Sequence, residues 1–335
     1  MTQPWKRWTV LCAVWACALV APALAQAAEL RWERYADPAP GSTSLDGVPD
    51  VHPPTIAFAV ANGTPYLAEI TRLPGHELTV YRGVRNRAWE QIGDGPLNAP
   101  GVSAISADFA TAGGNVWLAW SEGRSDPPRA EDAVVRVARI TRSGVEELPG
   151  SPIAAGSSPE IEYFGGHLYV TYRDSEFRAH ALRMRSNGRG LEAAGDLALV
   201  QAEQLGEYRG RLYAAGLNPD DLSAYRYLVL NRRGTGWSVV GDPPDNVFAP
   251  RIGNTAYTLG SSGGEAPGAP VFVHVFATRR GVTEELPSPA TPGNNVFAVP
   301  TLVVSNGTLW MQWTEGGPSD MAPPFVPHVA RLVRR

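Results

Sequence analysis

Cysteine is scarce in this sequence. Its two cysteines, Cys12 and Cys17, both lie in an apolar N-terminal segment, and none follows in the rest of the chain. Once that segment is removed, disulfides, thiolate metal sites and a cysteine nucleophile are all excluded. A chain of this length can bury a core large enough to be stable without disulfides, so the lack of cysteine is compatible with export.

Lysine is almost absent too. Lys6 is the only lysine, so nearly all basic side chains are arginines. The formal net charge is −4, and removing Lys6 and Arg7 from the 29 basic residues leaves 27 against 33 acidic ones. We expect no nucleic acid partner, because no basic stripe stands out and the overall balance is acidic.

Long apolar runs are missing beyond the N-terminus. Residues 9–20 are almost wholly apolar, two basic residues precede them, and Ala23-Leu24-Ala25 follows with the small-residue spacing that a signal peptidase recognises. This pattern predicts a cleaved signal peptide at 1–25, with cleavage after Ala27 as an alternative. No later segment approaches the ~18 apolar residues of a spanning helix. We therefore expect a secreted or periplasmic protein that does not insert into the membrane after signal removal.

Familiar catalytic and metal-binding motifs are also missing. The sequence has no phosphate-binding Gly-x-x-x-x-Gly-Lys loop and no Gly-x-Gly-x-x-Gly opening a helix. The histidines, none of them at metal-site spacing, are His52, His76, His167, His180, His274 and His328. We therefore expect neither a cofactor nor a metal site.

What the sequence does contain is a repeat. Six times a tight-turn pair precedes an aromatic residue, which lies three positions after the second turn residue. The aromatics are Tyr66, Trp117, Tyr169, Tyr213, Tyr257 and Trp310. The turn pairs are mostly Asn and Gly, which tolerate the positive φ that two-residue hairpins need. The spacings of 51, 52, 44, 44 and 53 residues average about 49, a period typical of propeller repeats built from short strands.

Each repeat is interpreted as four strands. In the sixth, residues 299–305, 308–313 and 328–333 form the first three, and no fourth follows. An unpaired strand, residues 30–35, begins the mature chain, so we expect it to complete the last repeat and close a ring. Six repeats account for about 294 of roughly 310 mature residues, which predicts a single domain at 26–335.

On these repeats the chain resembles the β-propeller superfamily over nearly its whole mature length. The resemblance implies an all-β fold, a six-bladed β-propeller with four antiparallel strands per blade. It assigns no subfamily, because the Trp-Asp pair of WD40 repeats and the Asp-box of sialidase-like propellers (Ser-x-Asp-x-Gly-x-Thr-Trp) are both missing. A β-sandwich or β-solenoid is the alternative, although alternating strands with hairpin turns argue against a parallel solenoid.

The sixth position after each turn is where we expect the second strand to end and a loop to begin. In a propeller such loops surround one end of the central channel, which is the usual binding face. Aromatic, acidic and arginine side chains gather there, as a sugar or peptide ligand would require. The candidate ligand-binding residues are Trp120, Glu122, Arg124, Tyr172, Arg173, Asp174, Trp313 and Glu315.

Three functions compete on this sequence. The leading hypothesis is an exported non-enzymatic binding module that holds a glycan, peptide or protein on the loop face around the channel. The first alternative is a secreted glycoside hydrolase or polysaccharide lyase, whose residues would converge from different blades and so escape linear motifs. The second is a structural scaffold in a surface or secretion assembly. Two carboxylates about 5–10 Å apart at the channel mouth would favour the enzyme.

Overall fold

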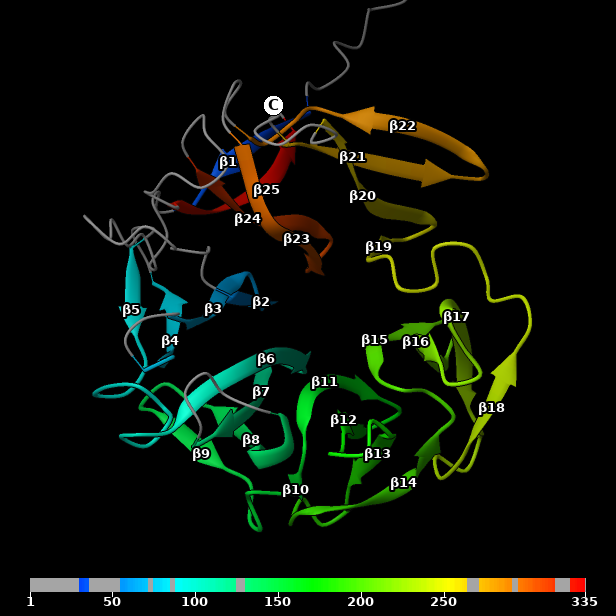
Figure 1. The fold of residues 1–335 in the computed structure, drawn as a ribbon. Coiled ribbons are helices and arrows are strands. Elements are labelled where there is room, and N and C mark those ends of the chain that lie inside the picture. Colours follow the sequence, from blue (N-terminus) through cyan, green and yellow to red (C-terminus); the bar gives the residue numbers. More distant parts are fainter. Residues whose placement is uncertain are drawn as a thin grey trace, which may run out of the picture.

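The computed structural model describes residues 30–35, 55–71, 75–84, 88–124, 130–263, 271–290, 295–316 and 326–334. These residues form six antiparallel sheets arranged as the blades of a ring (Figure 1). The fold is therefore the predicted six-bladed β-propeller. The expected signal peptide lies outside the described residues. Within the described ranges, no helix has the length and hydropathy needed to cross a membrane.

The blades follow one another along the chain. Around the centre, the first strands of blades 6, 1, 2, 3 and 4 contact one another in that order, whereas blade 5 contacts the first strand of blade 6 through its second and third strands. Blade 1 consists of β2 (Thr55–Ala61), β3 (Thr64–Ile70), β4 (Leu78–Gly83) and β5 (Trp89–Gln91). Blade 2 consists of β6 (Ser103–Ala112), β7 (Asn115–Gly123), β8 (Val134–Ile140), β9 (Val145–Glu147) and β10 (Ala154–Ala155). Blade 3 consists of β11 (Ser157–Phe164), β12 (His167–Arg173), β13 (Ala179–Met184) and β14 (Leu191–Leu197). In blade 2 both β9 and β10 pair with β8.

Blade 4 consists of β15 (Ala202–Tyr208), β16 (Arg211–Asn218), β17 (Asp221–Leu230) and β18 (Trp237–Val240). Blade 5 consists of β19 (Arg251–Ile252), β20 (Thr255–Gly263), β21 (Val271–Arg279) and β22 (Val282–Leu286). Blade 6 consists of β23 (Asn295–Ser305), β24 (Thr308–Gly316), β25 (Val326–Arg334) and β1 (Leu30–Arg34). One short 3₁₀ helix, Ala130–Asp132, is the only helix in the described part of the chain.

The two ends of the described chain meet in blade 6. Strand β1 pairs antiparallel with β25, with Trp32 opposite Leu332. Beyond the ladder, Arg331 donates to Glu33 at 2.8 and 2.9 Å, and the Trp32 indole donates to the Pro287 carbonyl at 2.7 Å. The predicted closure of the ring by the N-terminal strand is confirmed.

The turn pairs connect the first and second strands, as predicted. In five of the six turns both central residues have positive φ; Asn62 and Gly63, for example, have values of 50° and 76°. Such dihedrals match the twist of the flanking strands, which is why these pairs are rich in Asn and Gly. We call this end of the blades the turn end, because the third and fourth strands are also joined there. The opposite end is the loop end.

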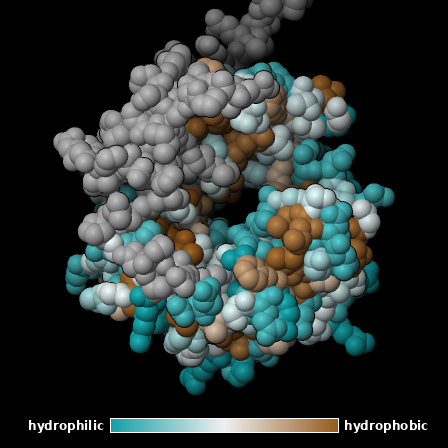
Figure 2. Space-filling view, in the orientation of Figure 1, coloured by the Kyte–Doolittle hydropathy of each residue, from teal (hydrophilic) through white to brown (hydrophobic). Residues whose placement is uncertain are grey.

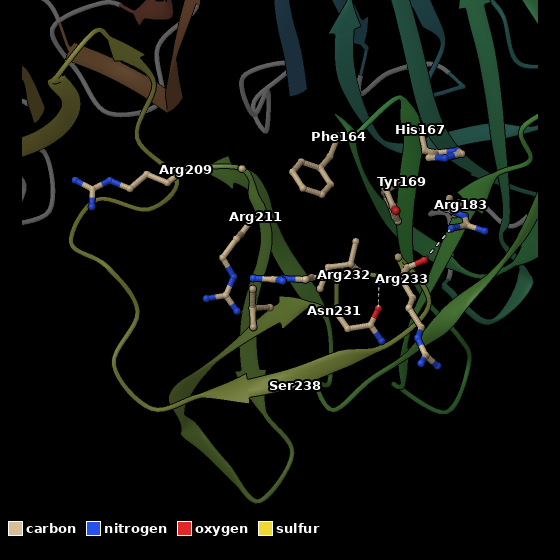
Figure 3. A pocket seen from close by; sticks show the side chains of 15 residues that line it. Phe164, His167, Tyr169, Arg183, Arg209, Arg211, Asn231, Arg232, Arg233 and Ser238 are labelled. Atoms are coloured by element: carbon tan, nitrogen blue, oxygen red, sulfur yellow. Dashed lines mark hydrogen bonds between the residues drawn. The ribbon is translucent and has the colours of Figure 1, made fainter.

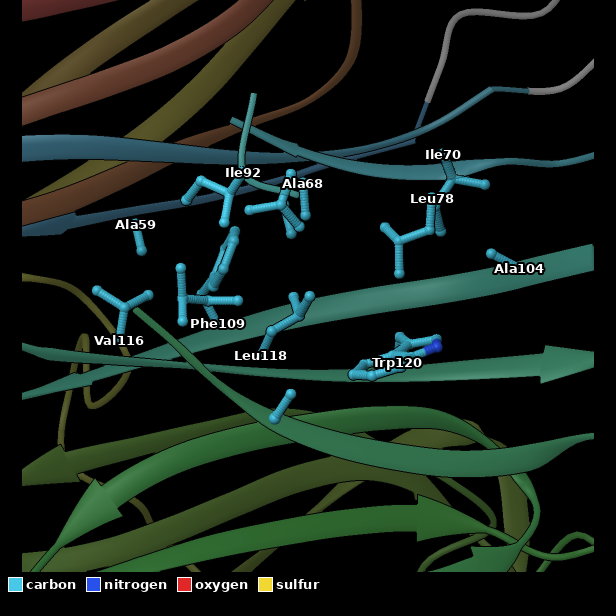
Figure 4. Packing of buried hydrophobic residues seen from close by; sticks show 14 of the residues in the cluster. Ala59, Ala68, Ile70, Leu78, Ile92, Ala104, Phe109, Val116, Leu118 and Trp120 are labelled. Atoms are coloured by element: carbon cyan, nitrogen blue, oxygen red, sulfur yellow. The ribbon is translucent and has the colours of Figure 1, made fainter. Parts of the chain in front are cut away.

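The hydrophobic core is divided among the spaces between neighbouring sheets. Between blades 1 and 2, Leu78, Leu118 and Trp120 are fully buried against the small side chain of Ala68 (Figure 4). The recurrent aromatic of every blade contacts one of these apolar clusters. Its repeated position is thus a packing position between sheets.

Blade 5 has an irregular inner edge. Its first strand, β19, contains only Arg251 and Ile252, and the ten residues before Arg251 include Pro243, Pro244 and Pro250. Proline lacks the N–H that a ladder requires, so this segment cannot form a long regular strand. Figure 2 shows a hollow at the centre of the ring. The irregular edge of blade 5 borders the channel cavity described below.

Candidate functional site

The predicted site at the loop end is largely occupied by internal contacts. Trp120 and Trp313 are 1% and 0% exposed, so neither ring is accessible to a ligand. Strands β7 and β24 do not end at these residues, as the sequence led us to expect, but continue to Gly123 and Gly316. The expected strand end is therefore wrong in these two blades, because the ladder with the third strand extends further.

Each buried tryptophan belongs to a polar cluster. The indole of Trp120 donates to Glu122 at 2.9 Å, and that of Trp313 donates to Glu315 at 2.8 Å. Both glutamates are 3% exposed. Arg136 donates to Glu122 at 2.5 Å, and in blade 6 an ion pair of 3.2 Å joins Arg34 to Glu315. These carboxylates already have internal partners, which buried charges require.

Blade 3 carries a more accessible version of the same cluster. Tyr172 stacks on His180 at 5.2 Å, and His180 contacts Asp174 at 2.8 Å. Desolvation would raise the pKa of Asp174, but hydrogen bonds from His180 and Arg178 hold it below its usual range. Tyr172, Asp174 and Arg173 are half-buried, and the Arg173 guanidinium lies 4.8 Å from the ring of Phe177.

Arg124, the remaining predicted residue, follows β7 and is exposed. The eight candidates belong to blades 2, 3 and 6, and none of them lines the cavities described below. A role for the accessible ones in binding stays a prediction.

Three of the histidines lie on the third strands of their blades. His180, His274 and His328 are on β13, β21 and β25, opposite the sixth-position residues Tyr172, Gly260 and Trp313. Each one contacts an acidic side chain of its own blade, respectively Asp174, Glu285 and Glu315. They are polar strand residues, each in a separate sheet.

A group of acidic residues that the sequence analysis did not single out lies on the inner strands. Asp108 is on β6, Glu160 and Glu162 are on β11, and Glu203 and Glu207 are on β15. These are the first strands of three consecutive blades, and neighbouring ones are in contact. An alignment of the repeats would have shown acidic residues in first strands whose other residues are mostly apolar or small. That contrast was the sequence signal from which this group could have been found.

Asp108 connects blades 2 and 3. Its two carboxylate oxygens accept the backbone N–H groups of Phe109 at 2.8 Å and Ile161 at 2.9 Å. Burial raises its pKa to about 6, although these two hydrogen bonds act in the opposite direction. The side chain thus satisfies an N–H at the inner edge of β11 that no neighbouring strand pairs.

The two β11 glutamates are held toward their neutral forms. Burial, followed by the charge of Asp108, raises the pKa of Glu162 to about 7. The same causes, with Glu203 in addition, raise the pKa of Glu160 well above its usual value. Crowded acids that share a partly desolvated space cannot all ionise near neutral pH, so the channel wall holds protons there.

Glu162 also lines a cavity of about 980 Å³ that spans the channel. We call it the channel cavity. Its wall comes from four blades and includes Glu162 of blade 3, Glu207 and Tyr208 of blade 4, Arg251 and Arg280 of blade 5, and residues 302–304 of blade 6. An acidic side therefore faces an apolar one formed by Leu302, Val303 and Val304.

One basic residue of this cavity, Arg251, is held by its surroundings. The Arg251 guanidinium lies 4.6 Å from the Tyr208 ring and donates to the carbonyls of Asp245 and Asn246 at 3.4 and 3.3 Å. Its Nε is buried and has no hydrogen-bond partner in the described residues. Glu207 accepts the N–H of Gly210 at 2.6 Å. The cavity thus offers a carboxyl donor, a carboxylate acceptor and guanidinium donors to one polar ligand.

Comparison with known proteins supports the fold. No family model matches the chain, and no curated protein matches it. Among solved structures, the chain is similar to Trypanosoma rangeli sialidase, with 11% identity, a TM-score of 0.57 and coverage of 90% of this chain and 59% of that one. It is also similar to a protein of unknown function from Dyadobacter fermentans DSM 18053, with 13% identity, a TM-score of 0.54 and coverage of 91% and 99%.

A polysaccharide lyase, Uly1, aligns with 12% identity and a TM-score of 0.44, covering 84% of this chain and 77% of that one. The chain spans 59% of the length of the sialidase. At these identities the likeness shows the propeller fold alone.

Proposed function

We propose that this protein is an exported propeller that binds a glycan in the channel cavity. The proposal rests on the lining of that cavity, to which four blades contribute. Glu162 of blade 3, with a pKa of about 7, and an apolar wall from blade 6 line the same space. Perturbed carboxyl groups in a cleft are characteristic of functional sites. The volume of about 980 Å³ is within the range of small-molecule sites.

The chemistry of the lining suits a sugar. Hydroxyl groups both donate and accept hydrogen bonds, so they can pair with the protonated Glu162, the Glu207 carboxylate and the arginine donors. The C–H face of a sugar ring can pack against Leu302 and Val304. The proposed site borders the channel, but its lining includes the turn-end residues Arg209, Asn254 and Arg280, so it differs from the loop-end site that the sequence predicted around Trp120 and Trp313.

A second candidate, glycoside hydrolysis, is favoured by one specific observation. Burial and the charge of Asp108 raise the pKa of Glu162 to about 7, and the charge of Glu207 adds a smaller contribution. A protonated carboxyl beside an ionised one is the arrangement that general acid catalysis of glycosidic bond cleavage uses. In this alternative Glu162 protonates the leaving glycosidic oxygen, and the Glu207 carboxylate takes a proton from the water whose oxygen attacks the anomeric carbon.

A glycan array on the protein without residues 1–25 tests the binding proposal. Sialylated glycans should be included, because T. rangeli sialidase has been solved with sialic acid bound. We expect a defined set of glycans to bind, and Glu162→Leu, which removes the hydrogen-bonding group, to lose them. Glu176→Gln, an exposed acid at the loop end of blade 3, is the matched control and should bind like the wild type. Equal binding by Glu162→Leu would refute the channel site.

Turnover of a bound glycan separates the two candidates. If the wild type releases a shorter product and Glu162→Gln binds without releasing it, the protein is a hydrolase. If both bind and neither cleaves, it is a binding module.

A further inference from the structure

A second cavity, of about 890 Å³, opens at the turn end between blades 3 and 4. Figure 3 shows arginine side chains from both blades arranged around it. Its basic residues are His167, Arg183, Arg209, Arg211, Arg232 and Arg233. We call it the arginine cavity. Among the residues that line it, none is acidic.

Blade 4 departs from the repeat at this cavity. In four other blades an ion pair joins the third strand to the fourth at one equivalent position. These pairs are Arg82–Glu90, Arg139–Glu146, Arg183–Glu192 and Arg331–Glu33. In blade 4 that position holds Val229 opposite Ser238, and both residues line the arginine cavity. The smaller side chains leave room where those four blades hold an ion pair.

The arginines that blade 4 supplies are not neutralised by the protein. Within the described ranges, no carboxylate lies at ion-pair distance from Arg209, Arg211, Arg232 or Arg233, and all four are exposed. The guanidinium of Arg209 lies 5.2 Å from the ring of Tyr208, and that of Arg211 lies 5.8 Å from the ring of Tyr213. Four uncompensated cations in one place contrast with a chain whose net charge is −4. They favour an anionic ligand.

Local hydrogen bonds hold this array in place. The side-chain oxygen of Asn231 accepts the backbone N–H groups of Arg233 at 3.0 Å and Thr235 at 3.3 Å, which orders the turn that carries Arg232 and Arg233. Arg183 of blade 3 donates to the Arg233 carbonyl at 3.3 Å and so links the two blades across the cavity (Figure 3). A ligand would therefore meet backbone positions that are already ordered.

We propose that the arginine cavity binds an acidic polysaccharide through its carboxylate or sulfate groups. Guanidinium groups pair with planar and tetrahedral oxyanions through two hydrogen bonds at once. The half-buried ring of Phe164, which lines the cavity, can contact a sugar ring between the charged groups.

The positive charge extends beyond one cavity. Arg209 lines the arginine cavity and the channel cavity alike, and Arg251 and Arg280 continue the charge into blade 5. Repeated charges along a chain match such an extended array better than a single small anion does.

The lining argues against single-stranded nucleic acid. Binding of that kind relies on aromatic rings free to stack on bases. Here Tyr169 is 2% exposed and packs against Phe164, with ring centroids 6.3 Å apart. The arginine cavity shares Arg209 with the channel cavity, and its other lining residues, all from blades 3 and 4, do not line the proposed glycan site.

Binding measurements with defined oligomers test the proposal. The probes are a heparin-derived oligosaccharide, an oligogalacturonate, a neutral cello-oligosaccharide, inorganic sulfate and a single-stranded oligonucleotide of matched charge. The test variant is Arg211→Gln/Arg232→Gln/Arg233→Gln, which leaves the shared Arg209 intact. The control is Arg31→Gln/Arg142→Gln/Arg189→Gln, which removes the same charge from exposed arginines outside the cavity. Circular dichroism and thermal unfolding confirm that both variants are folded.

We expect the wild type and the control to bind at least one acidic oligosaccharide equally well, and the cavity variant to bind it about 100-fold more weakly or worse. Whether the sulfated or the carboxylated probe binds more tightly identifies the anionic group. Equal weakening in both variants would show general charge attraction and overturn the proposal. So would failure of both acidic oligosaccharides to bind, or binding of sulfate or the oligonucleotide as tight as that of the best oligosaccharide.

Discussion

Two glutamates whose pKa values are about 7, Glu69 and Glu162, lie in different surroundings. Glu162 lines the channel cavity, where a ligand can use its proton. Glu69 is 3% exposed on β3, and its Oε1 has no hydrogen-bond partner in the described residues. Burial raises the pKa of Glu69 from 4.5 to about 7. For Glu69 the consequence is one of stability, because an ionised carboxylate there is desolvated without compensation.

Glu69 makes the stability of the fold dependent on pH. Between pH 4.5 and 7 the folded state holds a proton on Glu69 that the unfolded state has lost, so stability falls as the pH rises through this window. We expect Glu69→Gln to match the wild type at pH 4.5 and to exceed it at pH 8, by at most about 3 kcal/mol. Urea unfolding at both pH values measures this difference.

The control for this measurement is Glu176→Gln, an exposed acid paired with Arg178, which should leave the pH dependence unchanged. A Glu69→Gln variant with the same stability profile as the wild type from pH 4.5 to 8 would mean that the carboxyl is not desolvated as described.

At the scale of the strand, the sequence predicted correctly those features of the repeat that a few neighbouring residues determine. The turn pairs and the recurrent aromatic are encoded within a few residues, because positive φ and alternation along a strand are short-range properties. The same reasoning failed for Trp120 and Trp313. Exposed rings and buried ones look alike in sequence, and only the ladder beyond them shows that β7 and β24 continue.

The cavities could not be predicted in the same way. Glu162, Glu207, Arg251 and Val304 come from four different blades, and their convergence depends on the closed ring. The arginine cavity depends on a departure from the repeat, Val229 opposite Ser238, that is visible only once the third and fourth strands are in register.

The tryptophan–glutamate cluster of β24 leads to a prediction of its own. Trp313→Ala removes a fully buried ring and the donor to the buried Glu315, so we expect a loss of about 3–5 kcal/mol in the free energy of unfolding. Denaturant unfolding measures the loss. Trp237→Ala, which removes a partly exposed ring from β18, should cost less. If Trp313→Ala kept full stability and lost glycan binding instead, the original assignment of this residue to a ligand site would be right.

At the scale of the whole molecule, the ring is held closed by a contact between residues almost 300 positions apart. Strand β1 supplies the fourth strand of blade 6, and without it the edge of β25 would have unpaired N–H and C=O groups. The aromatic ring of Tyr35, just after β1, also packs against Trp310 and Trp89, at 5.9 and 5.6 Å. Strand β1 is therefore a connection between blades 6 and 1 as well as an edge strand.

Deleting residues 26–35 should open this connection. We expect a large drop in the midpoint of thermal unfolding and a tendency to self-associate, because an unpaired strand edge pairs with other chains. Differential scanning calorimetry and light scattering after size exclusion measure the two effects. Glu33→Gln is the control: it removes only a partly exposed ion pair with Arg331 and should cost no more than about 1 kcal/mol. A deletion variant that stayed monomeric with an unchanged unfolding midpoint would show that the ring does not depend on closure by β1.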